Sequence, residues 1–68
     1  MKVVLNGEPR ELDAQATVRE AVRAAGAPEE GRGVAVALDG EVVPRGRWDE
    51  TELRDGQRVE VVRAVQGG

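Results

Sequence analysis

Hydrophobic and polar residues alternate over short stretches at both ends of the 68-residue chain. In the opening stretch KVVLNGEPREL, Val3 and Leu5 share one face of a predicted strand. Asn6 and Gly7 are the residue pair that tight two-residue turns prefer, so the chain is predicted to reverse there into a hairpin. Pro9 cannot donate a hydrogen bond to a neighbouring strand, which places the returning strand at an edge of the sheet.

One helix is predicted, in the stretch ATVREAVRAAGAPEE. Its apolar residues recur at the spacing of a single helix face, at Val18, Ala21, Val22 and Ala25. Thr17 followed by Glu20 predicts a capping box, in which each side chain bonds to the other residue's backbone N–H. Gly26 suits the left-handed position after a helix, and Pro28 prevents continuation. The pattern therefore predicts about two and a half helical turns.

The second half of the chain predicts another hairpin and a last strand. The stretch VAVALDGEVVP turns at Asp39 and Gly40. Ala35 and Ala37 lie on its face away from the core, where small side chains allow another molecule to approach closely. In the last strand, RVEVVRAV, the alternation places Val62 on the face opposite the core.

The order of two strands, one helix and three further strands predicts an α+β protein with the β-grasp, or ubiquitin-like, architecture. A mixed β-sheet of about five strands is expected to pack one main helix on one face. The last strand is expected beside the first and parallel to it. We expect residues 1–64 to form this domain and residues 65–68 to form a flexible tail ending in Gly-Gly.

The composition argues against catalysis by the chain itself. There is no Cys and no His, which removes thiol chemistry, the commonest general base and the commonest metal ligand. We therefore expect no metal and no cofactor. The net charge of −3 argues against nucleic acid as a partner, and no apolar run has the length of a membrane span. The opening residues lack the apolar region of a signal peptide, so a cytoplasmic protein is expected.

Several conspicuous residues have a structural interpretation. Trp48 is predicted to close an edge of the core. Arg45 and Arg47 are interpreted as solvated loop charges, with a contact to an acidic partner surface as the alternative. The turn pairs are interpreted as turn chemistry without a function: Asn6-Gly7, Asp39-Gly40 and Asp55-Gly56.

The last residues carry no reactive side chain, but they end in two glycines. Gly67 and Gly68 allow a carboxylate to enter a channel that is too narrow for any Cβ, with Val65 and Gln66 completing the threading segment. A carboxylate is a poor electrophile until ATP activates it as an acyl-adenylate. A sulfur nucleophile can then displace AMP and leave a thiocarboxylate, with a partner enzyme supplying all the catalytic groups.

The chain resembles the ThiS family of sulfur carriers in thiamine biosynthesis. The resemblance runs through VVLNGEP, TVREAV and DGQRVEVVRAVQGG, and it is most specific in VALDGEVVPRGRW. It implies that an E1-like enzyme, ThiF, adenylates Gly68 with magnesium and ATP. It further implies that a cysteine desulfurase supplies the sulfur and that thiazole synthase, ThiG, receives it. Gln66 departs from relatives with a small residue there, and we expect its side chain to fit.

Val62 and Val4 are hypothesised to form an exposed apolar patch that docks the sheet onto the activating enzyme. Other functions remain open. They are a sulfur carrier for another pathway such as molybdopterin synthesis, a ubiquitin-like modifier joined to lysines through Gly68, and an interaction module without covalent chemistry. An independent enzyme is the weakest alternative, because the necessary side chains are missing.

Overall fold

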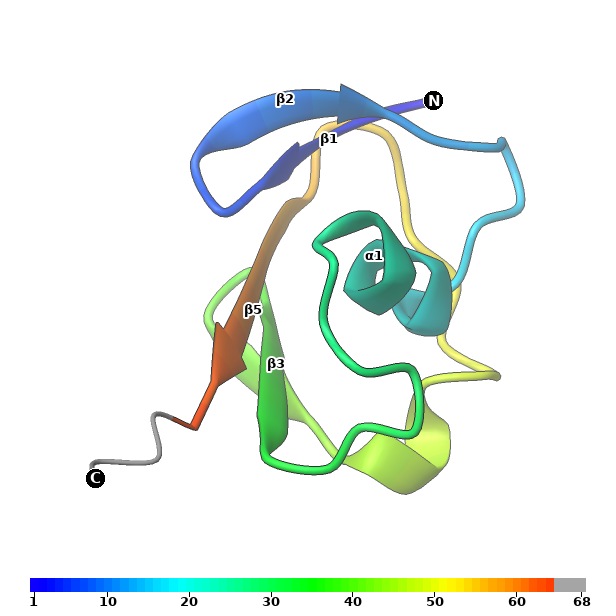
Figure 1. Ribbon diagram of the computed structural model, residues 1–68. Coiled ribbons are helices and arrows are strands. Elements are labelled where there is room, and N and C mark those ends of the chain that lie inside the picture. The colour runs from blue at the N-terminus through cyan, green and yellow to red at the C-terminus, as the bar shows by residue number, and fades with distance from the viewer. Residues whose placement is uncertain (65–68) are drawn as a thin grey trace.

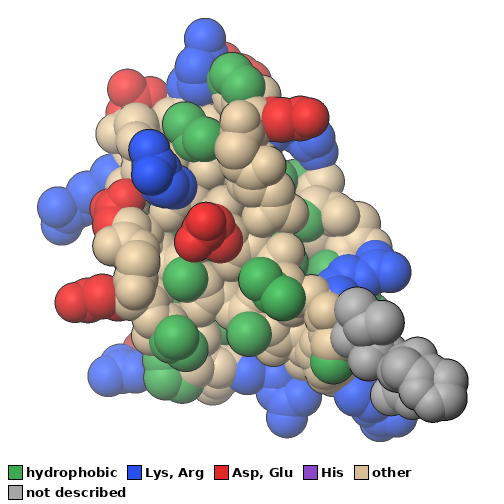
Figure 2. Space-filling view, turned by 90° about the vertical axis from the view of Figure 1, so that its left-hand side faces the viewer, with side chains coloured by type: hydrophobic (Ala, Val, Ile, Leu, Met, Phe, Trp, Pro, Cys, Tyr) green, Lys and Arg blue, Asp and Glu red, His purple; other side chains and the backbone are tan. Residues whose placement is uncertain are grey.

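The computed structural model describes residues 1–64, and residues 65–68 lie outside its described part. Its elements in chain order are β1 (Lys2–Leu5), β2 (Glu8–Glu11), α1 (Val18–Ala24), β3 (Val34–Leu38), β4 (Glu41–Val43), the 3₁₀ helix η1 (Arg45–Arg47) and β5 (Arg58–Arg63). The strands form one sheet in the order β2-β1-β5-β3-β4, with β1 and β5 parallel and the other neighbours antiparallel. Helix α1 covers one face (Figure 1), and the described residues leave the other face open (Figure 2). The predicted β-grasp architecture is confirmed.

Both hairpins turn where the sequence predicts. Asn6 and Gly7 have φ angles of 51° and 85°, and Asp39 and Gly40 have 49° and 88°. Positive φ at both central positions is the requirement of a type I′ turn, whose twist matches that of the flanking strands. Pro9 lies in β2 at the edge of the sheet, as its missing N–H requires.

Helix α1 begins at the predicted residue, but its cap differs from the prediction. Thr17 is the N-cap, and its side chain makes no capping hydrogen bond, so the predicted capping box is wrong. The Val18 N–H instead donates to the Thr51 carbonyl at 2.9 Å, and the Arg19 N–H donates to the Trp48 carbonyl at 3.3 Å. Backbone carbonyls from a distant segment thus satisfy the first helical donors. The helix is shorter than predicted, with 7 residues.

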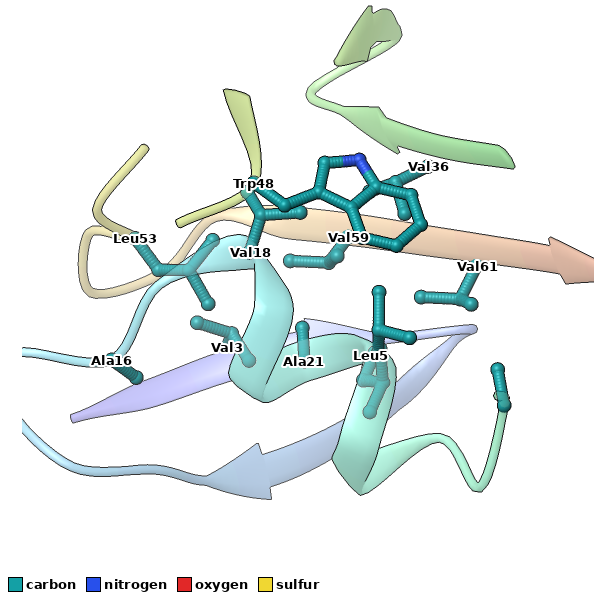
Figure 3. Close-up of a cluster of buried hydrophobic side chains, with 12 residues drawn as sticks. Val3, Leu5, Ala16, Val18, Ala21, Val36, Trp48, Leu53, Val59 and Val61 are labelled. Carbon is teal, nitrogen blue, oxygen red and sulfur yellow. The ribbon is translucent and has the colours of Figure 1, made fainter. Parts of the chain in front are cut away.

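The hydrophobic core lies between α1 and the covered face of the sheet (Figure 3). Its buried side chains are Val3, Leu5, Ala16, Val18, Ala21, Val22, Ala27, Val36, Trp48, Leu53, Val59 and Val61. Trp48 is the largest of them and is only 1% exposed. Its indole N–H donates to the Val43 carbonyl at 2.9 Å, which satisfies the one polar atom of the ring. The predicted structural role of Trp48 is therefore confirmed.

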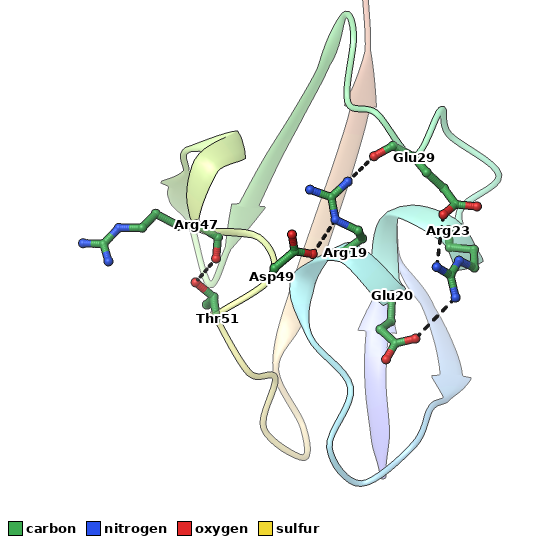
Figure 4. Close-up of polar contacts among 7 residues, drawn as sticks. All are labelled: Arg19, Glu20, Arg23, Glu29, Arg47, Asp49 and Thr51. Carbon is green, nitrogen blue, oxygen red and sulfur yellow. Dashed lines mark hydrogen bonds and ion pairs between the residues drawn. The ribbon is translucent and has the colours of Figure 1, made fainter.

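A polar network ties α1 to the loops on either side of it (Figure 4). The Arg19 guanidinium lies 5.5 Å from the centre of the Trp48 ring, within the range of a cation–π contact. Its Nε donates to the Asp49 carboxylate at 2.5 Å, and its Nη1 donates to the Glu29 carbonyl. The Glu29 carboxylate accepts a hydrogen bond from Arg23 at 3.0 Å and raises the pKa of that guanidinium. These contacts hold the loop after the helix against the core.

The two loop arginines next to Trp48 are exposed, as predicted. Arg45 donates to the Glu30 carbonyl at 3.3 Å, and Arg47 lies 3.8 Å from the Glu50 carboxylate. Exposed pairs of this kind contribute little to stability, because water screens them. Both residues therefore fit the interpretation as solvated loop charges, and the alternative of a partner contact stays a prediction.

Candidate functional site

Strand β5 carries the chain out of the fold toward its carboxyl end. It occupies the centre of the sheet between β1 and β3. At its end the Ala64 N–H donates to the Gly33 carbonyl at 2.6 Å, and the Arg63 guanidinium donates to the Gly26 carbonyl at 3.0 Å. The chain is therefore held to the fold as far as Ala64.

The residues with the most specific predicted chemistry follow directly. Val65, Gln66, Gly67 and Gly68 lie outside the described residues, so the roles given to them above stay predictions. The same holds for the prediction of a flexible tail over residues 65–68. What the structure describes is the surface around Ala64, the residue that precedes them in the sequence.

The open face of the sheet carries an apolar patch near the end of β5. Val62 is 61% exposed and lies opposite Ala35 of β3. Val42 is 75% exposed and lies opposite Ala37 of β3. Figure 2 shows hydrophobic side chains gathered in the lower part of this face. We call Ala35, Ala37, Val42 and Val62 the open-face patch.

The structure does not bring Val4 together with Val62. Val4 alternates with core residues of β1, which places it on the open face, but it is half-buried. Its register partner on β5 is Arg58, four positions before Val62. Arg58 and Glu60 share this face of β5 and separate the two valines. Val62 is therefore exposed as predicted, but the other exposed large hydrophobic side chain of the described residues is Val42 and not Val4. A docking role for Val62 and Val4 stays a prediction.

Sequence reasoning missed Val42 for a physical reason. Val42 and Val43 are adjacent valines in a three-residue strand, and nothing local tells which of them faces the core. The pairing of β4 with β3 decides which valine faces the core. Val43 lies opposite the buried Val36 and shares its face, so Val42 lies on the open face. The predicted small face of β3 was the available signal, since the residue that pairs with Ala37 must lie on the same face of the sheet.

The described residues hold no acidic cluster suited to a metal ion. Among residues 1–64 no group of three or more Asp or Glu side chains is placed to hold a metal ion. A shallow hollow beside the open-face patch is lined in part by Val42, Val43, Pro44 and Thr51, at the edge of the sheet. Within the described part of the chain, no helix is long and apolar enough to cross a membrane.

Comparison with known proteins places this geometry in a family. Residues 3–68 match the sequence profile of the ThiS family. The chain is 44% identical over 66 residues to the sulfur carrier protein ThiS of Thermus thermophilus, covering 97% of this chain and 98% of the relative. It is also 35% identical over 68 residues to a thiazole synthase of Paramagnetospirillum magneticum. The chain spans only 20% of that longer protein.

Solved structures agree with the sequence comparison. The crystal structure of the thiamine biosynthesis protein ThiS from Geobacter metallireducens superposes with a TM-score of 0.78 at 33% identity, and all of both chains is covered. SAMP1 from Haloferax volcanii shares the fold at a TM-score of 0.58 and 21% identity, over 98% of this chain and 97% of that one. The family profile spans nearly the whole sequence, so the predicted resemblance is confirmed. The chain belongs to the ThiS family.

Proposed function

We propose that this chain carries sulfur for thiazole formation in thiamine biosynthesis, bound as a thiocarboxylate at Gly68. The observation that carries the proposal is the 44% identity to a ThiS sulfur carrier over nearly the full length of both chains. The composition supports it as well, because a chain without Cys and His fits a carried substrate better than a catalyst.

The chemistry begins with activation of the Gly68 carboxylate by an E1-like, ThiF-type enzyme that binds magnesium and ATP. A carboxylate oxygen attacks the α-phosphorus of ATP, and pyrophosphate leaves. The terminal sulfur of a cysteine-desulfurase persulfide then attacks the acyl carbon and displaces AMP. A thiol reductant cleaves the resulting S–S bond and releases the thiocarboxylate. In this scheme the chain acts as a co-substrate of other enzymes and is not itself an enzyme.

Thiazole synthase, of the ThiG type, is the proposed acceptor of the sulfur. The similarity of this chain to one fifth of a thiazole synthase supports this partner. Because activation consumes ATP, we place the carrier in the cytoplasm, where ATP and the sulfur-donating enzymes are available.

The open-face patch is proposed to dock on the activating enzyme. Val42 and Val62 are the two large hydrophobic side chains that the described surface exposes most, and exposed apolar patches mark interaction sites. Val62 also lies two residues before the last described residue, so a partner bound at the patch is close to the start of the carboxyl end. Burying these side chains against an enzyme would direct residues 65–68 toward its nucleotide site.

Two variants test the docking face. Val62→Asp places a charge in the patch and is expected to weaken binding to the ThiF-type enzyme at least about tenfold. Gln15→Asp adds the same charge at an exposed position in the loop before α1, away from the sheet, and is the matched control. Both proteins should retain the wild-type circular dichroism spectrum. Equal affinities for the two variants would show that the enzyme binds elsewhere.

The function itself is tested by mass spectrometry. After incubation with the ThiF-type enzyme, magnesium, ATP and a desulfurase with cysteine, one oxygen at Gly68 should be replaced by sulfur. Trypsin cleavage after Arg63 releases the peptide AVQGG, which separates this change from the nearly equal mass of an oxidised Met1. The adduct must depend on ATP and disappear when Gly68 is deleted. An isopeptide between Gly68 and a lysine would favour a protein modifier instead.

A further inference from the structure

The side chain of Asn6 continues the pairing between β1 and β5 beyond the end of β1. The parallel ladder ends at the pair Leu5 and Val59, yet β5 runs on for four more residues. The Asn6 backbone N–H donates to the Val59 carbonyl at 2.8 Å. Its side-chain Oδ1 accepts from the Val61 N–H at 2.8 Å, and its Nδ2 donates to the Val61 carbonyl at 3.3 Å. One amide side chain thus takes the place of the next strand residue.

On its opposite edge β5 is held by β3, and this pairing continues beyond Val61. The antiparallel register runs through the pair Val34 and Arg63, and the Ala64 N–H then donates to the Gly33 carbonyl. Without Asn6, β5 would present an unpaired N–H and an unpaired carbonyl at Val61 on its β1 side. Strand β5 is therefore held on both edges as far as Val61 only because the Asn6 side chain reaches it.

We propose that Asn6 is a positioning residue for the reaction at Gly68, an inference that rests on the proposed sulfur-carrier function. Strand β3 holds the chain as far as Ala64, and four residues in extended form, the number from Val65 to Gly68, would span about 14 Å. A fixed origin and direction for such a short arm raise the effective concentration of its carboxylate at the partner's reactive site. Releasing the end of β5 lengthens the arm and lets its direction vary.

Asp39 provides a matched control within the same fold. It occupies the first position of the other type I′ turn, with a φ of 49° against 51° for Asn6. It also holds β5, but at the opposite end, where its Oδ1 accepts from the Arg58 N–H at 3.0 Å. Glycine fits both turn positions, so both variants keep the turn. Asn6→Gly removes two side-chain hydrogen bonds to Val61, and Asp39→Gly removes one to Arg58 of β5 and one to Gln57.

The first measurement is amide hydrogen exchange by NMR on the free carrier. Asn6→Gly should speed exchange about tenfold at Val61 and also speed it at Ala64, because the Val61 N–H loses its side-chain acceptor and the strand end loosens. Asp39→Gly should speed exchange at Arg58 and leave Val61 and Ala64 unchanged. Unchanged exchange at both Val61 and Ala64 in Asn6→Gly would overturn the inference, whatever the carrier's function.

The second measurement is ATP–pyrophosphate exchange with the ThiF-type enzyme. Asn6→Gly should lower kcat about tenfold with little change in KM, since the docking face is intact while the carboxylate is less well directed. Asn6→Asp keeps the acceptor for the Val61 N–H but loses the donor, and should fall between Asn6→Gly and the wild type. Equal kcat values for Asn6→Gly and Asp39→Gly would overturn the positioning role. A wild-type carrier that supports no exchange would refute the proposed function, and the amide data would still show whether Asn6 holds the end of β5.

Discussion

Gly31 packs directly against Trp48, and replacing it with alanine should destabilise the fold for two separable reasons. Its φ of +80° lies in the left-handed region, where a side chain costs about 1–2 kcal/mol. A Cβ would also lie 2.8 Å from Cζ3 and 3.0 Å from Cη2 of the Trp48 ring. The ring is 1% exposed and held by its hydrogen bond to Val43, so it cannot swing away freely.

The steric part of the cost can be estimated from these contacts. The same Cβ would come within 2.5 Å of Cδ of Arg45, but that exposed side chain can move at small cost. The buried Trp48 ring must instead shift by a few tenths of an ångström inside a packed core, which typically costs about 1–3 kcal/mol. Gly31→Ala should therefore lose about 2–5 kcal/mol in total. A domain of this length has only about 3–10 kcal/mol to lose.

Gly26→Ala is the control that separates strain from overlap. Gly26 has a φ of +76°, and a Cβ there would meet nothing within 4 Å. It should lose only the strain cost of about 1–2 kcal/mol. Urea unfolding can be followed by the fluorescence of Trp48, the one aromatic residue in the chain, and by circular dichroism. With a slope of about 1 kcal/mol per molar urea, the two midpoints should differ by about 1–3 M. Equal midpoints would refute the packing argument.

Three further outcomes follow from the observed contacts. Thr17→Ala should cost less than about 0.5 kcal/mol in urea unfolding, below the usual loss for an N-cap, because the Thr17 side chain caps nothing. A loss above about 1 kcal/mol would mean that its hydroxyl does cap the helix in solution. Trp48→Phe should lower the free energy of unfolding by about 2–4 kcal/mol, because it removes the hydrogen bond to Val43 and leaves a void in the core. Urea unfolding followed by circular dichroism measures this loss, and a loss near zero would contradict the burial of the ring. Arg23→Gln should shift the urea midpoint by the same small amount at neutral and mildly alkaline pH. Glu29 raises the pKa of Arg23, so the stabilising contribution of this pair is fully present below the ordinary arginine pKa. It is lost only as the pH rises through the raised pKa. A change in urea midpoint that fades at mildly alkaline pH would contradict this assignment.

Features set by neighbouring residues could be predicted from the sequence. The turns at Asn6 and Asp39 follow from the need for positive φ, and the edge position of β2 follows from Pro9. The buried stripe of α1 follows from its spacing. These features depend on a few consecutive residues, so the chain's own chemistry is sufficient to specify them.

Features set by distant residues were predicted less well. The cap on α1 was mispredicted because the carbonyls that satisfy its first donors come from Trp48 and Thr51, about thirty positions further along the chain. The exposure of Val42 depends on the β3–β4 register. The contact between Asn6 and Val61 joins residues 55 positions apart and exists only because β5 enters the sheet next to β1. None of these three features can be predicted from residues that are neighbours in the sequence.

Polar turn residues have a second task in this fold, which explains how so small a core keeps its central strand in place. Asn6 and Asp39 hold the two ends of β5, and the Asp55 carboxylate accepts from the Lys2 N–H at 2.8 Å at the start of β1. A domain of 68 residues buries too little apolar surface to fix every strand by packing alone. Hydrogen bonds from turn side chains to backbone add the missing constraints at the places where two strands stop pairing. Under the proposed function, in which another enzyme acts at Gly68, the strand that leads to residues 65–68 is the one whose position matters most. That strand receives two of these three contacts.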